Sequence, residues 1–370
     1  KSLKSAIDDR YTAHRNWWQQ FWDRSWIEIE STDTISTALG VEFQGKVLTR
    51  AYTLQRFITA CAARGKYPIK FNGSLFTVEK EGEEGFADYR RWGTGYWWQN
   101  SRMPVIGMLA SGDTDLMQSF FNMYVDQIPF QQYKTKSTLR QEGTYYAECI
   151  YFWGGTFTET WGKKSLAEKG DGIQESGWHK WEWVSGPELV SMMMDYYRFT
   201  RDEQFAREKL FPVAKQILLF FNQYYKKNDA GKLVFHPSQA LETWWQCTNA
   251  MPEVAGLHWM VKELPALPGL QLPEDLAELI KQTAPALPEL PTRELDGKKM
   301  LSPAEKFDDK RNVENPELYA VFPFRFYGLG KPDIELALNA WHQRDPRGYF
   351  GWRQDDLWAA LLGLTEEAAK

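Results

Sequence analysis

The strongest candidates for catalytic residues in this chain lie between Val234 and Trp245, in the sequence VFHPSQALETWW. There a single carboxylate, Glu242, comes just before two adjacent indoles, Trp244 and Trp245. Because a Pro-Ser pair cannot continue a helix, we expect Glu242 on a loop or at the start of an element. Indole faces can cover the C–H side of a sugar ring, and apolar surroundings raise the pKa of a carboxyl group. The segment therefore predicts a sugar site with Glu242 as general acid. In a plainer interpretation, the indoles are core residues and Glu242 is a solvated charge.

Composition narrows the classes of function. The 370 residues include 18 Trp, 17 Tyr and 22 Phe, and aromatic side chains in such excess usually also line a concave surface. The formal net charge is −5 without a Lys or Arg cluster, which argues against a nucleic-acid partner. No apolar run approaches the ~20 residues of a membrane span. Three widely spaced cysteines and five histidines show no metal-binding spacing, so we expect no metal and no cofactor.

Helical periodicity dominates the sequence. Apolar residues recur at helical spacing in 186–200 and 202–227, which predicts an antiparallel helix pair. Further helices are expected near 5–25, 47–63, 99–110, 113–127, 249–263, 273–287, 315–327, 332–343 and 352–364. Short extended pieces are expected at 69–71, 146–152 and 233–235, within long aromatic loops at 64–98, 141–186 and 228–248. This arrangement indicates a mainly α fold, an α/α toroid with a cleft formed by its loops.

The order of these segments resembles the catalytic domain of glycoside hydrolase family 95 and its relatives in the six-hairpin (α/α)6 superfamily. Tyr67–Gly73 resembles the turn after the first barrel helix, and Gln99–Pro104 resembles a substrate-facing loop entering a helix. Trp183–Phe221 is similar to the central helix pair. Pro237–Glu242 matches the Pro-Ser-x-x-x-Glu spacing whose glutamate is the family's general acid. Two later segments, Glu317–Pro323 and Gly351-Trp352, resemble motifs that come later in the family's catalytic domain.

The resemblance implies a linker helix at residues 1–30 and an (α/α)6 barrel of antiparallel helix pairs at residues 31–370. About ten barrel helices are expected where the superfamily has twelve, so we expect a fragment of a larger protein that lacks the last helix pair. The implied partners are an oligo- or polysaccharide substrate and flanking β-domains of the same protein. The implied location is periplasmic or extracellular, without membrane insertion.

A second carboxylate is needed to activate water, and the resemblance implies inversion of the anomeric centre. Glu148, in an aromatic loop, and either Asp355 or Asp356 are the candidates. Glu148 could instead form a cap or salt bridge, and either aspartate could complement a helix dipole. The candidates for substrate binding, which carry amide, carboxylate, guanidinium or indole groups, are Asn72, Asp88, Arg91, Trp92, Trp98, Asn100, Arg102, Trp178, Trp181, Trp244, Trp245, Glu317 and Trp352.

Two departures from the family concern specificity. Its Asn-x-Asn pair reads Thr94-Gly95-Tyr96 here, and its His-x-x-His reads Glu314-Asn315-Pro316-Glu317. These changes alter the hydrogen bonds offered to a sugar, so fucose specificity is not expected.

Two other functions stay open at this point. A polysaccharide lyase would use a Tyr or His base (Tyr145, Tyr146 or His179), with Arg90 and Arg91 neutralising a uronate. A non-catalytic glycan-binding module would keep the tryptophans without the acid chemistry. The leading hypothesis is hydrolysis of a plant or host glycan.

Overall fold

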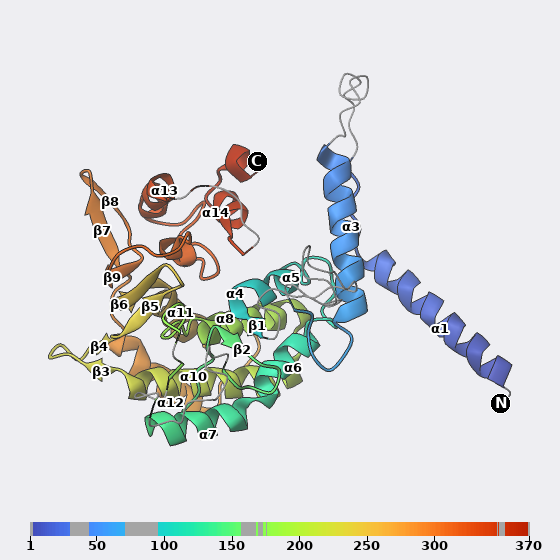
Figure 1. Cartoon of the computed structure of the whole chain (residues 1–370), viewed down its shortest axis with the longest axis horizontal. Coiled ribbons are helices and arrows are strands. Elements are labelled where there is room, and N and C mark those ends of the chain that lie inside the picture. The colour runs from blue at the N-terminus through green and yellow to red at the C-terminus, as the bar shows by residue number, and fades with distance from the viewer. Residues whose placement is uncertain are drawn as a thin grey trace. The chain divides into compact units, whose positions relative to one another are not determined.

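The structure is a computed structural model, and it describes residues 3–29, 44–70, 95–156, 168, 173–174, 176–345, 347 and 352–368. The chain divides into two compact units. Unit 1 comprises Lys1–Gly93 with Ser101–Met123, and unit 2 comprises Thr94–Asn100 with Tyr124–Lys370. Helices dominate the described residues, which confirms the mainly α class (Figure 1). No helix within these ranges is long and apolar enough to cross a bilayer.

Unit 1 contains α1 (Leu3–Arg24) and α3 (Gln44–Ala62), close to the helices expected at 5–25 and 47–63. A buried ion pair holds unit 1 together. The Arg56 guanidinium donates to both oxygens of Asp113 at 2.8 Å and lies 4.2 Å from the centre of the Phe21 ring. Because both charges are buried, each needs the other to offset its lost hydration.

The expected helix pair is confirmed in unit 2 as α8 (Ser185–Thr200) and a run of α9 (Glu203–Phe205), a π-helical turn (Ala206–Leu210) and α10 (Phe211–Tyr224). Asp202 starts this run, because its Oδ1 accepts from the backbone N–H of Phe205 at 2.9 Å. Close packing of α8 against α10 requires Gly186, where a Cβ would lie 2.5 Å from Cδ1 of Ile217.

Four more helices lie near their expected positions: α11 (Met251–Glu263), α12 (Glu274–Thr283), α13 (Ile334–Gln343) and α14 (Asp355–Leu361). A short α15 (Thr365–Ala368) follows. The helix expected at 113–127 is shorter, as α6 (Gln118–Asp126). One helix, α7 (Ile128–Leu139), was not expected. Its buried residues, Gln131 and Thr135, are polar, so the sequence lacks the apolar spacing that indicates a helix.

Two expected helices are wrong. The range 99–110 is broken into α4 (Trp98–Ser101) and α5 (Met103–Ile106), with Pro104 in the first turn of the second piece. The range 315–327 holds only a 3₁₀ turn, Pro316–Ala320, because prolines at 316 and 323 bracket a segment too short for a helix.

Much of the loop expected at 228–248 is instead strand, although the short extended piece expected at 233–235 is confirmed as β4 (Leu233–Val234). After the β3 (Lys226–Lys227) and β4 ladder, β5 (Ser238–Ala240) and β6 (Trp244–Ala250) pair antiparallel, and β9 (Ala304–Lys306) pairs with the other edge of β6. The side chains of β6 are not alternately buried and exposed, so period-two patterning did not mark it.

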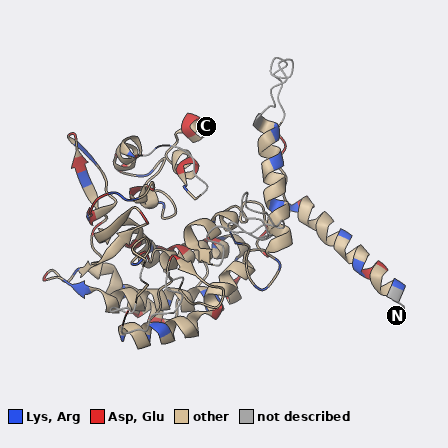
Figure 2. Ribbon diagram, in the orientation of Figure 1, with Lys and Arg blue, Asp and Glu red and all other residues tan. Residues whose placement is uncertain are grey.

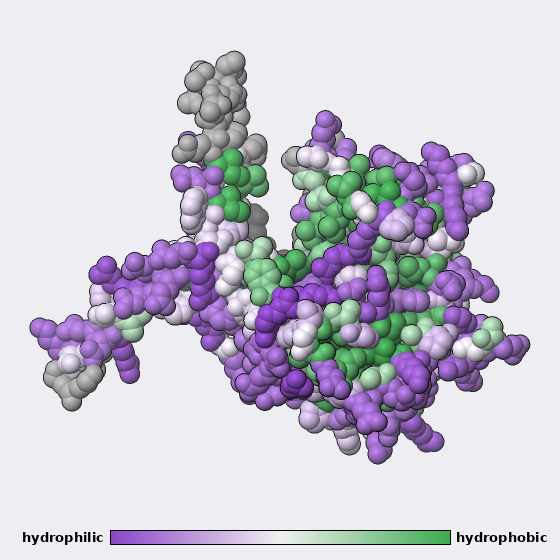
Figure 3. All heavy atoms as spheres, turned by 180° about the vertical axis from the view of Figure 1, so that it is seen from behind, coloured by the Kyte–Doolittle hydropathy of each residue, from purple (hydrophilic) through white to green (hydrophobic). Residues whose placement is uncertain are grey.

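Two further ladders complete the strands of unit 2. The strands β1 (Tyr96–Trp97) and β2 (Cys149–Ile150) pair antiparallel. The hairpin of β7 (Thr292–Leu295) and β8 (Lys298–Leu301) carries both signs of charge (Figure 2). The face of unit 2 seen in Figure 3 mixes hydrophobic and hydrophilic side chains.

The expected α/α toroid would close through packing of α3 against α14. These two helices belong to different units, which are each described by themselves, so closure of the toroid stays a prediction.

Candidate active site

Glu242 lies in the turn of the β5–β6 hairpin. Ala240 pairs with Trp244, so only Leu241, Glu242 and Thr243 form the connection. Leu241 has a φ of 54°, in the left-handed region that a leucine rarely adopts, and its side chain is buried. Strain of this kind persists where the surroundings hold the backbone in place. The turn therefore presents Glu242 in a defined direction, at a loop position as the Pro-Ser signal indicated.

A second segment, residues 308–314, runs along this turn and is called the clasp below. The backbone N–H of Arg311 donates to the carbonyl oxygen of Thr243 at 2.9 Å. The Thr243 hydroxyl donates to Oε2 of Glu314 at 2.8 Å and accepts from the Glu314 N–H at 3.1 Å. Asn312 Nδ2 donates to Oε2 of Glu242 at 2.8 Å. The clasp thus holds both the backbone of the turn and the carboxyl group at its tip.

The indoles after Glu242 are held by neighbouring rings. Trp245 donates from Nε1 to the carbonyl oxygen of Glu242 at 2.8 Å, and its ring meets Trp178 edge-on at 4.8 Å between centroids. The Arg311 guanidinium lies 4.8 Å from the Trp245 ring centre. This packing requires Gly177, where a Cβ would lie 2.7 Å from the Trp245 ring. Trp178 stays 43 % exposed, so an aromatic surface beside the acid remains open to solvent.

Two more buried carboxyl groups are joined by Gln99. Its backbone N–H donates to Oε1 of Glu148 at 2.8 Å, and its side-chain Nε2 donates to Oε1 of Glu182 at 3.1 Å. The short β1–β2 ladder brings Gln99 and Glu148 together from distant parts of the sequence. Oε2 of Glu182 is buried and accepts no hydrogen bond from any described residue.

These carboxyl groups interact electrostatically, as a set that we call the acid cluster (Glu148, Glu182, Glu242 and Glu314). Burial, and to a smaller extent the nearby charge of Glu314, raise the pKa of Glu242 to about 8, against the opposing effect of the hydrogen bond from Asn312. Burial also raises the pKa of Glu182 well above its usual range, and the other three members add to that. Interacting buried carboxyls cannot all ionise together. At neutral pH the cluster therefore holds protons, and Glu242 is in the form that a general acid needs.

Other buried acids of unit 2 bind N–H groups of the fold. Glu188 Oε2 accepts from Nε1 of Trp98 at 2.6 Å, and Glu253 Oε1 accepts from the backbone N–H of Trp183 at 3.1 Å. Burial raises the pKa of Glu253 to about 8 and that of Glu317 to about 6. A raised pKa alone therefore does not single out Glu242. Its place in the turn beside the open indole does.

Asp355, the other expected candidate for the second carboxylate, is held between two arginines. Arg344 Nε donates to Oδ1 at 3.1 Å, while Arg353 donates from Nη2 to Oδ1 at 2.7 Å and from Nε to Oδ2 at 2.8 Å. All three side chains are buried, and Asp356 beside them is exposed. The geometry gives Asp355 a structural task, and its catalytic role stays a prediction.

The remaining expected binding residues fall in three groups. Asn72, Asp88, Arg91 and Trp92, like Arg90 and Thr94, lie outside the described residues. Arg102 belongs to unit 1, where it is buried. The others belong to unit 2, where Trp98 and Glu317 are buried and Asn100, Trp181, Trp244 and Trp352 are half-buried. Of the binding candidates, the structure brings Trp178 and Trp245 together beside Glu242.

Two of the three candidates for a lyase base, Tyr146 and His179, are poorly suited to remove a proton. The Tyr146 hydroxyl donates to the carbonyl oxygen of Tyr124 at 2.8 Å, and burial raises its pKa further above the ordinary tyrosine value. Burial lowers the pKa of His179 to about 4, and its ring packs edge-on against Trp97 at 5.3 Å. A neutral imidazole could accept a proton, and the arginines expected to neutralise a uronate, Arg90 and Arg91, lie outside the described residues.

Sequence reasoning missed three residues that the structure places around Glu242. Glu182 is not among the candidates from the sequence, and Glu314 appears there only as a departure from the family pattern. Asn312 carried no signal at all. The clasp reaches the turn from about 70 positions away, as the Asn312–Glu242 and Thr243–Glu314 bonds show, so local patterns do not reveal it.

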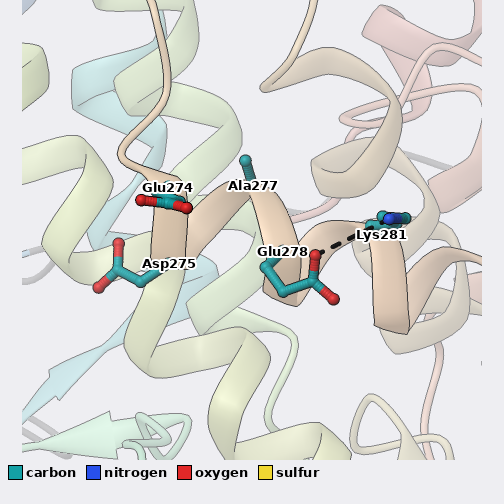
Figure 4. A pocket seen from close by; sticks show the side chains of 5 residues that line it. All are labelled: Glu274, Asp275, Ala277, Glu278 and Lys281. Atoms are coloured by element: carbon teal, nitrogen blue, oxygen red, sulfur yellow. Dashed lines mark ion pairs between the residues drawn. The ribbon is translucent and has the colours of Figure 1, made fainter.

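Across the described ranges, no group of three or more His, Cys, Asp or Glu side chains could hold a metal ion. One surface hollow of about 610 Å³ lies along α12 and is lined by Glu274, Asp275, Ala277, Glu278 and Lys281. Figure 4 shows these side chains projecting from a single helix, with an ion pair between Glu278 and Lys281 at 4.0 Å. None of the acid cluster lines it, so this hollow is no part of the candidate active site.

Comparison with known proteins finds a family match that includes Glu242. Residues 114–261 match the model of the glycosyl hydrolase family 95 catalytic domain. The family resemblance is thereby confirmed over this part of the chain, which includes Glu242 and the α8–α10 pair. The match supports a glycoside-active enzyme.

The search of solved structures includes one described as "Putative kojibiose phosphorylase from human microbiome", with 13% sequence identity and a TM-score of 0.39. The similarity covers 60% of this chain and 30% of that chain, so this chain spans well under half of that protein. No curated protein matches the chain.

Proposed function

We propose that this protein hydrolyses a glycosidic bond in a plant or host glycan, with Glu242 as the general acid. The observation that carries the proposal is the carboxyl of Glu242 in a fixed turn beside the indoles of Trp178 and Trp245, where burial raises its pKa to about 8. The match of residues 114–261 to the family 95 catalytic domain supports the same reaction class.

In the proposed reaction, Glu242 gives its proton to the glycosidic oxygen as the bond between that oxygen and the anomeric carbon breaks. A second carboxylate removes a proton from water, whose oxygen bonds to the anomeric carbon from the opposite face, so the configuration inverts. Glu148 is better suited to this step than Asp355, because two buried arginines bind both oxygens of Asp355. The hydrogen bond from Gln99 would stabilise the ionised form of Glu148.

A screen of aryl glycosides and of plant and host glycans tests the proposal, with NMR of the anomer first released. We expect hydrolysis of at least one neutral glycan with inversion. A product bearing a 4,5-unsaturated uronate would show a lyase instead. Binding of a glycan without any product would show a binding module, and either outcome would overturn the proposal.

A further inference from the structure

The orientation of the Asn312 amide decides which oxygen of Glu242 can carry the proton. Oδ1 of Asn312 accepts from the backbone N–H of Val313 at 2.9 Å. A backbone N–H is only a donor, so this bond fixes the carbonyl side of the amide and leaves Nδ2 toward Glu242. Nδ2 in turn donates to Oε2 of Glu242 at 2.8 Å. Oε2 is therefore an acceptor, and the acidic proton belongs on Oε1.

We infer that the clasp, residues 308–314, is the positioning element of the general acid, in which Asn312 directs the proton to Oε1 of Glu242 and Glu314 keeps it there. The inference rests on the proposed function, and it assigns these residues no contact with substrate. It deepens that proposal by naming the groups that prepare Glu242 before a glycan arrives.

Glu314 is fixed by its own contacts with the turn. The Thr243 hydroxyl donates to Oε2 of Glu314 at 2.8 Å, and Thr243 directly follows Glu242. A negative charge held at this position disfavours a second charge on Glu242. The bond from Asn312 acts in the opposite direction, because a donor stabilises the ionised carboxylate. Glu314 thus raises the pKa of Glu242, whereas Asn312 lowers it.

Other charged groups face the same turn. Glu182, from the segment before α8, interacts with Glu242 through its charge. Arg311 lies over the Trp245 ring and donates to Asp308 at 3.3 Å, and Asp308 accepts from the backbone N–H of Trp245 at 3.3 Å. Arg311 is thus neutralised in part by Asp308. Among the acidic residues of the clasp, Glu314 is the one whose charge raises the pKa of Glu242.

The test is a direct titration of Glu242 without substrate. The full chain is labelled with ¹³C at the glutamate carboxyl, and the signal that disappears in Glu242→Gln identifies Glu242. We expect its midpoint to fall by about one to three units in Glu314→Gln, which removes the charge but can still accept from Thr243. In Asn312→Ala the midpoint should rise. If Glu314 and Asn312 only supported the fold, their substitution would not shift the pKa of Glu242 in opposite directions.

Controls keep this test separate from the proposed function and from misfolding. Glu278→Gln removes one exposed charge on α12 and should leave the midpoint unchanged. Asn312→Ser, which is smaller but polar, replaces Asn312→Ala if that variant does not fold by circular dichroism. Equal midpoints in the wild type and both clasp variants would overturn the inference, whether or not a glycan is cleaved. Opposite shifts without hydrolysis of any glycan would retain the clasp and reject the hydrolase.

Discussion

Replacement of Glu242 by Gln is expected to lower kcat/KM for natural glycosides by about 10²–10⁴-fold, the usual contribution of a positioned general acid. Glutamine is close in shape and can still accept from Asn312 Nδ2, but it cannot give a proton to the glycosidic oxygen. A natural glycan has a poor leaving group, so loss of protonation should dominate its rate.

Leaving-group ability separates this role from binding. An aryl glycoside with a good leaving group needs little protonation, so Glu242→Gln should affect it far less than the natural glycan. The measurement is kcat/KM on both substrate types, with Glu278→Gln on exposed α12 as the control. Equal losses on both substrates would mean that Glu242 contributes to binding and not to proton transfer.

The second large effect is expected at Asp355, and it is an effect on stability. Asp355→Asn should lower the free energy of unfolding by about 3–5 kcal/mol, the usual cost of removing one partner from a buried ion pair. The side chains of Arg344 and Arg353 are 7% and 1% exposed, so both would keep a buried charge without its carboxylate. Urea unfolding at neutral pH measures the change.

The neighbouring residue supplies the matched control. Asp356→Asn makes the same substitution at an exposed position in the same helical turn, and it should change stability by less than about 0.5 kcal/mol. If Asp355→Asn folds as stably as the wild type but no longer cleaves glycans, the structural account is wrong. Asp355 would then be the catalytic base that the sequence suggested.

Long amphipathic helices were the part of the fold most accessible to sequence reasoning. The α8 and α10 faces follow helical spacing closely, and their connection carries a capping aspartate, Asp202. Polar or broken elements were less accessible. The buried positions of α7 are Gln131 and Thr135, and β6 does not alternate, so neither shows the apolar period that would identify it.

Only the contiguous part of the candidate site could be predicted from the sequence. The turn, the carboxylate and the adjacent indoles of 237–245 are contiguous, and their types suggest the chemistry directly. The residues that set the protonation of Glu242 come from other segments. Glu314 and Asn312 approach through the clasp, and Glu182 precedes α8. Their proximity follows from tertiary packing, which a single sequence does not display.

The pH dependence of kcat/KM on a natural glycan tests the central claim most directly. The pKa of Glu242 is raised to about 8, so the protonated, active form persists below that pH and is lost above it. We therefore expect an alkaline limb with a midpoint near 8, falling tenfold for each further pH unit. A limb that already falls near 4.5, the ordinary glutamate value, would contradict the assignment of Glu242 as a general acid held protonated by this site.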